Sequence, residues 1–111
     1  MNINNLTTGK IDWKSLPEKE LKGENGSTKY KEITSGGYRV RLAEYSANYS
    51  SAEWCDKGHI LHCISGTLTL HLKNGSKIVL NVGDSILLGS THPHTATTGS
   101  TPAVLLIIDN E

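Results

Sequence analysis

The chain has 111 residues, with 11 basic and 11 acidic side chains and a formal net charge of zero. This length suits one domain, and the balanced charge argues against a nucleic-acid or anionic-membrane partner, because both require a basic patch. No apolar run is long enough to span a bilayer, and residues 1–5 lack the features of a signal peptide. We therefore expect a cytoplasmic protein whose cysteines, Cys55 and Cys63, are thiols.

Residues 1–28 are expected to form an N-terminal arm that packs outside the main fold. The segment is polar and interrupted by glycines and a proline, and Trp13 is a bulky anchor in its middle. One short helical turn is expected at residues 15–21, because Ser15 is placed to cap it and Glu18 follows three residues later.

Residues 29–111 are expected to form one β-barrel, because their apolar residues recur with a period of two and no stretch has helical periodicity. Gly-rich and Asn-Gly turns separate the runs. The final run, 103–108, is apolar throughout and is expected to be fully buried. Short strands at close spacing predict an all-β sandwich or barrel. The expected strands cover residues 29–34, 38–46, 53–55, 59–64, 67–72, 77–80, 85–88, 94–97 and 103–108.

Three side chains of metal-ligand type lie within residues 53–59, two on the short predicted strand 53–55 and one at the start of the next strand. Glu53 and Cys55 are two residues apart, so in an extended segment they point to the same face. A turn at residues 56–58 would bring His59 back beside Cys55. Because a cation needs several donors that converge on one point, this cluster predicts a shared pocket.

The same segment resembles the first motif of the cupin superfamily, reading Glu53-x-Cys55-x3-His59-x6-Gly66. The second cupin motif is matched by Val82-Gly83-Asp84, a strand, and His92-Pro93-His94, in which His94 falls at the position of the motif histidine. The resemblance implies a cupin-type double-stranded β-helix, or jelly roll, with an N-terminal arm.

Residues 54–60, Trp-Cys-Asp-Lys-Gly-His-Ile, resemble in particular the small DHCW-motif cupin proteins. Residues 22–26 and 39–45 look like the same family, so the resemblance covers nearly the whole chain. Ala52 and Glu53 stand where that family has Asp-His. The resemblance implies a fold and a site, but no specific activity.

The resemblance completes a candidate divalent metal site of four ligands, Glu53, Cys55, His59 and His94. A thiolate and a carboxylate would neutralise a dication, and two neutral imidazoles would complete the set. Zinc suits this mixture best, and iron, nickel and copper remain alternatives. In a barrel without metal, Cys55 would instead be a small buried side chain, Glu53 a solvated charge and His59 a core histidine.

Three classes of function stay open for this site. The first is a metal-dependent enzyme, such as an oxygenase, isomerase or lyase, that acts on a small molecule in the barrel and needs an open coordination position. The second is a binding or sensing module, and the third is a closed structural metal site. No separate nucleophile–base pair is evident, and a disulfide between Cys55 and Cys63 is a weaker fourth alternative.

The remaining candidates are expected to lie outside the site. His62 alternates away from His59, His71 is structural, and His92 is expected at the rim. Cys63 should point inward as a core residue, and Trp54 should point away from the ligands.

A homodimer is expected through the face of the strand 59–64 that points away from the pocket. The side chains on that face are Ile60, His62 and Ile64.

Overall fold

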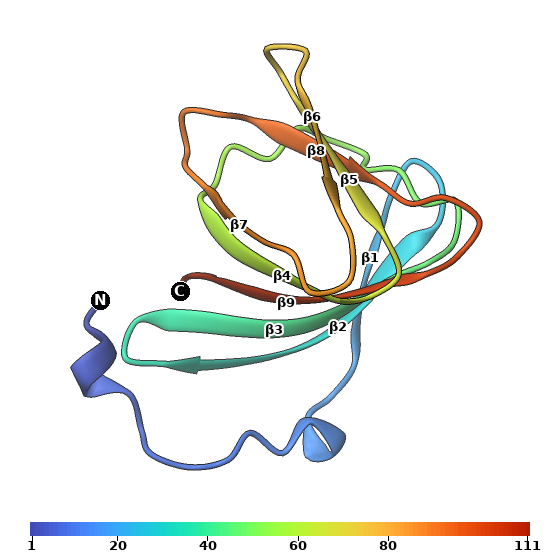
Figure 1. Ribbon diagram of the computed structural model, residues 1–111. Coiled ribbons are helices and arrows are strands. Elements are labelled where there is room, and N and C mark those ends of the chain that lie inside the picture. Colours follow the sequence, from blue (N-terminus) through green and yellow to red (C-terminus); the bar gives the residue numbers. More distant parts are fainter.

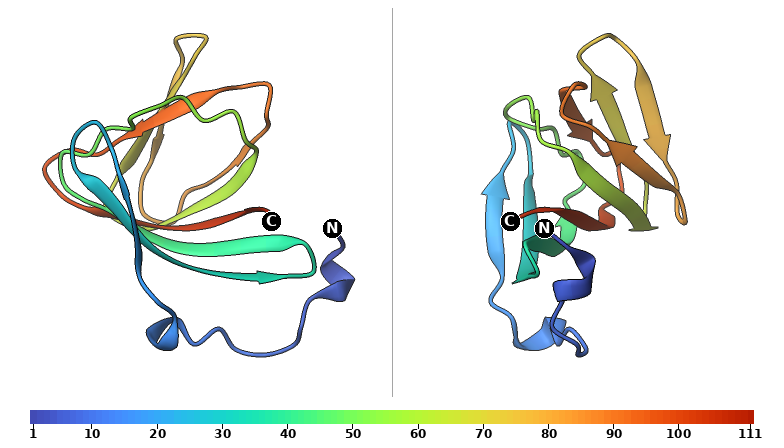
Figure 2. Two further views of the ribbon diagram at one scale, coloured as in Figure 1. Left: turned by 180° about the vertical axis from the view of Figure 1, so that it is seen from behind. Right: turned by 90° about the vertical axis from the view of Figure 1, so that its left-hand side faces the viewer.

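The computed structural model describes residues 1–111 and consists mainly of antiparallel strands (Figure 1). The larger sheet has the strand order β1-β2-β3-β9-β4-β7, and the smaller sheet has the order β6-β5-β8. The two sheets face each other around a shared interior, which confirms the all-β jelly-roll prediction (Figures 1 and 2). The elements are η1 Ile3–Asn5, η2 Trp13–Ser15, β1 Lys19–Lys22, β2 Ser27–Ser35, β3 Tyr38–Tyr45, β4 His59–Ser65, β5 Leu68–Leu72, β6 Lys77–Leu80, β7 Ser85–Leu88, β8 His94–Thr97 and β9 Ala103–Asn110. No helix in the structure has the length and apolar character needed to cross a membrane.

The alternation of apolar and polar residues located most of these strands, but the strand predicted at residues 53–55 is wrong. In that segment only Cys55 has a ladder partner, an isolated bridge to His94. The bridge consists of two hydrogen bonds, Cys55 N–H to His94 O at 2.8 Å and His94 N–H to Cys55 O at 2.9 Å. The segment is therefore a loop that is attached to β8 at one point.

The arm also differs from the expectation near its end. The helical turn expected at residues 15–21 is wrong, because η2 ends at Ser15 and Leu16 is extended. Pro17 explains the end of the turn, since the residue before a proline disfavours the helical conformation. Strand β1 follows and pairs with β2, so sheet structure begins at Lys19, within the segment predicted as the arm. All four β1 side chains are exposed, so the sequence shows no alternation there.

The first residues of the arm run outside the larger sheet, beside the β2–β3 turn (Figure 2). Asn2 N–H donates to Gly36 O at 3.3 Å, and Thr7 N–H donates to Ser35 Oγ at 2.8 Å. The arm therefore has defined contacts with the end of this hairpin.

Strand β9 is buried on one face, so the prediction that residues 103–108 are fully buried is wrong. Ala103, Leu105 and Ile107 are buried, whereas the residues between them are only partly covered. The smaller sheet covers the inner face of β9, and no second layer covers its outer face (Figure 1).

The neighbouring outer face of β4 is also apolar, with Ile60 45% and Ile64 46% exposed. Leu87 pairs with Ile60 across the β4–β7 ladder and is 81% exposed. This is the face through which a homodimer is expected, and the homodimer stays a prediction.

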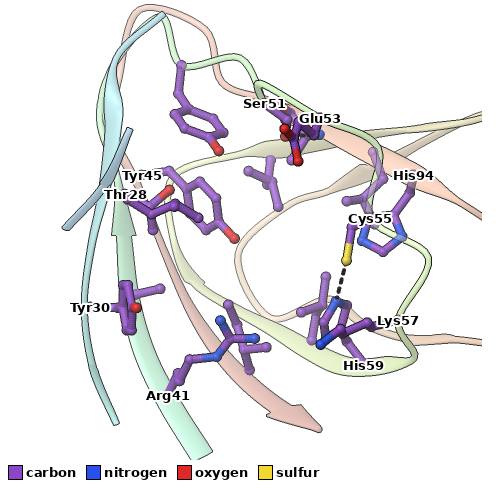
Figure 3. Close-up of a pocket in the computed structure, with 18 of the residues that line it drawn as sticks. Thr28, Tyr30, Arg41, Tyr45, Ser51, Glu53, Cys55, Lys57, His59 and His94 are labelled. Carbon is purple, nitrogen blue, oxygen red and sulfur yellow. Dashed lines mark hydrogen bonds between the residues drawn. The ribbon is translucent and has the colours of Figure 1, made fainter. Parts of the chain in front are cut away.

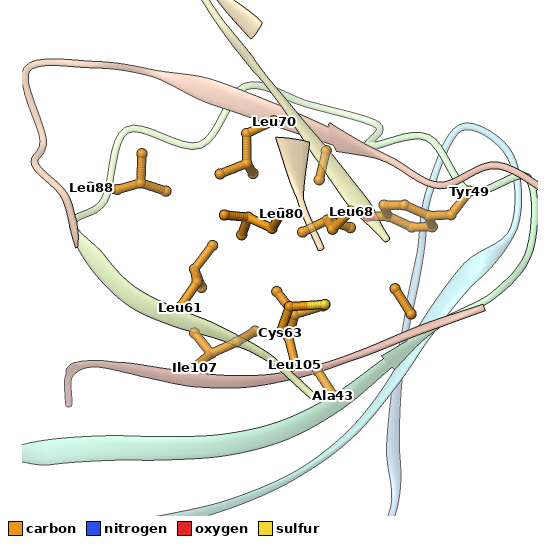
Figure 4. Packing of buried hydrophobic residues seen from close by; sticks show 12 residues of the cluster. Ala43, Tyr49, Leu61, Cys63, Leu68, Leu70, Leu80, Leu88, Leu105 and Ile107 are labelled. Carbon is orange, nitrogen blue, oxygen red and sulfur yellow. The ribbon is translucent and has the colours of Figure 1, made fainter. Parts of the chain in front are cut away.

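The inner face of β3 carries polar side chains into the interior of the barrel. Arg39, Arg41, Ala43 and Tyr45 alternate onto one face, as the period of two predicts, and this face lines a cavity inside the barrel (Figure 3). The apolar core lies beside that cavity and joins both sheets (Figure 4). Its largest fully buried side chains are Leu68, Leu70, Leu105 and Cys63. The core residue predicted at Cys63 is therefore confirmed.

Candidate functional site

Three of the predicted ligand residues meet at one point in the barrel. The ligand atoms of Cys55, His59 and His94 all lie within 4.8 Å of one another. Cys55 comes from the β3–β4 loop, His59 begins β4 and His94 begins β8, so both sheets contribute. The bridge between Cys55 and His94 fixes the loop against β8, and this brings the thiol close to both imidazoles.

The thiol contacts the His59 ring directly, and the His94 ring packs against that of His59 (Figure 3). Cys55 Sγ lies 3.3 Å from His59 Nε2. The rings of His59 and His94 are nearly perpendicular, with centroids 5.4 Å apart and an interplanar angle of 81°. Cys55 and His59 are thus in contact, and a thiol–imidazole pair of this kind was not evident from the sequence.

A buried carboxylate orients His59 from the far side of its ring. His59 Nδ1 donates to Asp109 Oδ2 at 2.8 Å, and the Asp109 side chain is only 3% exposed. Since an ionised carboxylate only accepts hydrogen bonds, Nδ1 carries the proton and the neutral ring presents the lone pair of Nε2 to Cys55. A histidine ligand held in this way has its coordinating nitrogen fixed before a metal arrives.

Two arginines hold the Asp109 carboxylate in turn. Arg39 donates from Nε at 2.9 Å and from Nη2 at 3.0 Å, and Arg41 donates from Nη2 at 2.8 Å. Burial opposes ionisation of Asp109, but the hydrogen bonds from Arg39 and the charges of Arg41 and Arg39 outweigh it, so the pKa of Asp109 lies below its ordinary value. Asp109 is therefore an anion when it accepts the hydrogen bond from His59 Nδ1.

Both imidazoles of the cluster favour their neutral form. Burial lowers the pKa of His59, although the adjacent Asp109 carboxylate opposes the shift. Burial also lowers the pKa of His94. Neutral imidazole is the form that ligates metals, so the local environment suits coordination.

The donor set fits a divalent metal ion. His94 is buried, and its Nδ1 has no hydrogen-bond partner within the chain. A buried polar atom without a partner is costly, and here it belongs to a side chain that already contributes to a three-donor cluster. One thiol and two imidazoles form a ligand set that zinc and other borderline metals accept.

Glu53 lines the same cavity, but it is not part of the three-donor cluster. Its side chain is exposed and lies near Ser51, away from the sulfur of Cys55 (Figure 3). The structure thus brings together three of the four predicted ligands.

The other histidines lie elsewhere, as expected. His62 contacts Ser85 Oγ at 2.7 Å, His71 contacts Thr97 Oγ1 at 2.8 Å, and His92 is exposed beside Thr91.

Trp54 is half exposed, with Lys73 Nζ 5.6 Å from its ring centroid. Trp54 also lines the cavity that contains the three-donor cluster.

Sequence reasoning missed Asp109, Arg39 and Arg41 as parts of the site. Asp109 has the same parity as Leu105 and Ile107, so it continues the inward face of β9, and a carboxylate on an inward face needs partners. The parity of Asp109 is the signal that could have identified it. Its partners lie 50 to 70 residues away, and only the strand register brings them together.

Comparisons with known proteins identify the fold. No protein-family model matches the sequence, and no curated protein matches it. The structure is similar to the polyketide cyclase RemF from Streptomyces resistomycificus, with a TM-score of 0.78 and 16% identity over 94% of this chain and 80% of that one. It is also similar to a cupin-2 domain protein from Rhodospirillum rubrum, with a TM-score of 0.74 and 12% identity over 95% and 76%.

A third similar structure is Fe(II)-HppE with an alternative substrate, with a TM-score of 0.74 and 15% identity over 95% of this chain and 62% of that one. These likenesses show that the chain has the cupin fold. They include enzymes and an iron-containing protein, and at these identities they carry no activity over to this chain.

Proposed function

We propose that this protein binds one divalent metal ion through Cys55, His59 and His94 and presents it to a small molecule in the barrel cavity. The observation that carries the proposal is the convergence of three donor atoms within 4.8 Å, one of them on a histidine whose buried Nδ1 has no partner. Relationship to the DHCW-motif cupin proteins is part of the proposal and rests on residues 54–60.

Zinc is the metal that we propose, because it accepts a mixed thiolate and imidazole set without a strong geometric preference. Iron, nickel and copper are the alternatives that metal analysis would separate. When bound, such an ion acts as a Lewis acid toward a ligand oxygen. Asp109 would orient His59, and the Cys55–His94 bridge would keep two of the ligands in register.

Glu53 is proposed to stay outside the coordination sphere, so that a position remains open for a small molecule. The Glu53 side chain is exposed, and it is absent from the donor cluster. An open position favours a metal-dependent enzyme or a binding module over a closed structural site.

A titration of metal-free protein with cobalt(II) tests the ligand set. Thiolate coordination should produce a sulfur-to-cobalt absorption band at one equivalent, and Cys55→Ser should lose it. Glu53→Ala should keep the band, with a cobalt affinity within about threefold of the parent. A band of equal strength in Cys55→Ser would contradict thiol ligation, and a large loss of affinity in Glu53→Ala would place Glu53 among the ligands.

A second candidate function is a thiol enzyme that works without metal. The contact of Cys55 with His59, and of His59 with Asp109, has the order of nucleophile, base and orienting carboxylate. In such an enzyme the sulfur of Cys55 would bond to an acyl carbon and expel the leaving group, while His59 takes the thiol proton. The arrangement leaves His94 without a role, which is why the metal site is preferred.

Incubation of metal-free protein with 4-nitrophenyl acetate separates the two candidates. The thiol enzyme requires stoichiometric release of 4-nitrophenol and an acetyl group on Cys55, with both lost in His59→Ala. If the site binds metal instead, Cys55 in the folded, metal-free protein should be acetylated no faster than Cys55 in unfolded protein.

A further inference from the structure

One wall of the cavity is polar and carries donors that the chain does not use. Thr28 and Tyr30 on β2, and Arg41 and Tyr45 on β3, line it from adjacent strands. Thr28 pairs directly with Tyr45 in the ladder, and the guanidinium of Arg41 lies over the Tyr30 ring, 5.8 Å from its centroid. In Figure 3 these four side chains lie together, apart from the three-donor cluster.

Two buried donors on this wall have no partner. Thr28 is 6% exposed, and its Oγ1 makes no hydrogen bond within the chain. The Nε of Arg41 is likewise buried and unpaired, although its Nη2 binds Asp109. Buried polar groups are normally hydrogen-bonded, and both of these unpaired atoms belong to residues that line one cavity. Their position favours an acceptor supplied from outside the chain.

Two arginines on this wall share one buried carboxylate. Arg39 and Arg41 share the single carboxylate of Asp109, while Glu32, which pairs with Arg41 in the ladder, is bonded to Lys19 at 3.4 Å. Because both guanidinium groups bind the same carboxylate, not all of their donors are used by the chain, and an anionic ligand could accept from those that remain.

Tyr45 adds a neutral donor. Burial raises the pKa of Tyr45 to about 12, so its hydroxyl keeps its proton at neutral pH. Tyr45 also packs edge-to-face with Tyr49, with ring centroids 5.1 Å apart, which fixes the ring in the wall.

The wall formed by the smaller sheet is apolar except for His94. Leu68 and Leu70 of β5 and Ala96 of β8 line the same cavity, which has a volume of about 560 Å³. This volume lies within the range of small-molecule sites, and the apolar wall suits a hydrocarbon portion of the ligand.

We propose that the cavity binds a small carboxylate with an apolar body, whose carboxylate is held by Arg41, Thr28 and Tyr45. Arginine is the side chain best suited to a carboxylate, because its planar fork donates from several nitrogens. The inference extends the proposed function by naming the chemical class of the small molecule, and the carboxylate site itself does not require the metal.

The test measures binding of hexanoate and its uncharged counterpart hexanamide by calorimetry, with zinc-loaded and with chelator-treated protein. Hexanoate should bind at least tenfold more tightly than hexanamide in both forms. Thr28→Val should lower the hexanoate affinity about fivefold without lowering the melting temperature. Thr69→Val is the matched control, because Thr69 alternates with Leu68 and Leu70 and faces away from the cavity.

Several results would overturn the carboxylate site. They are equal affinity for the two compounds, no measurable binding of either, or equal hexanoate affinity in Thr28→Val and Thr69→Val. A hexanoate preference that disappears on chelation would overturn it as well, since the carboxylate would then be binding the metal. A preference that persists in protein that takes up no metal would support the carboxylate site while refuting the metal proposal.

Discussion

Asp109→Asn is expected to lower the free energy of unfolding by about 3–5 kcal/mol, the cost of removing one partner from a buried ion pair. The substitution leaves Arg39 and Arg41 facing each other without the carboxylate that both bind at 2.8–3.0 Å. It also removes the charged acceptor of the His59 Nδ1 proton. Urea denaturation of the metal-free protein measures the loss without a contribution from bound ion.

Glu32→Gln is the control for this experiment. Glu32 also forms an ion pair, with Lys19 at 3.4 Å, but the Lys19 side chain is 50% exposed. Pairs of this kind contribute at most about 1 kcal/mol. If Asp109→Asn and Glu32→Gln had the same free energy of unfolding, the interactions of the Asp109 carboxylate would not contribute the expected stability.

His94→Ala is expected to lower the affinity for zinc by at least about 100-fold, since loss of a second-shell partner alone typically costs 10–100-fold. The variant removes one of three donors and leaves Cys55 and His59 in place. His92→Ala is the matched control, because His92 lies two residues away and is exposed. Competition with a chromophoric chelator measures both affinities.

Equal zinc affinity in His94→Ala and His92→Ala would exclude His94 from the site. Asp109→Asn provides an intermediate case, with an expected loss of about 10–100-fold, because Asp109 acts only through His59.

The strands were predictable because their signal is local. In a strand that is buried on one side the side-chain period is two, and the Gly and Asn-Gly turns mark where each run ends. The strand β1 was missed because its four residues are exposed and carry no alternation. Residues 103–108 were predicted to be buried on both faces because composition cannot show that only one face of the larger sheet is covered.

The candidate site was predictable only in part, because only some of its residues are joined by a local pattern in the sequence. Cys55 and His59 were grouped because the turn at residues 56–58 would bring them together, and His94 was found through the second cupin-like motif. Glu53 was grouped with Cys55 because alternate residues of a strand share a face, but the segment is a loop in which alternation does not apply.

Asp109 lies 50 residues from His59, and no local pattern joins them. Long-range register of this kind is set by the whole sheet.

Metal analysis of untagged protein, combined with its melting temperature before and after chelation, tests the central claim most directly. We expect one divalent ion per chain and a lower melting temperature after chelation, because an ion that binds only the native state stabilises it by mass action. The claim would be contradicted if the chelator left the melting temperature unchanged and if His59→Ala and His94→Ala carried as much metal as the parent.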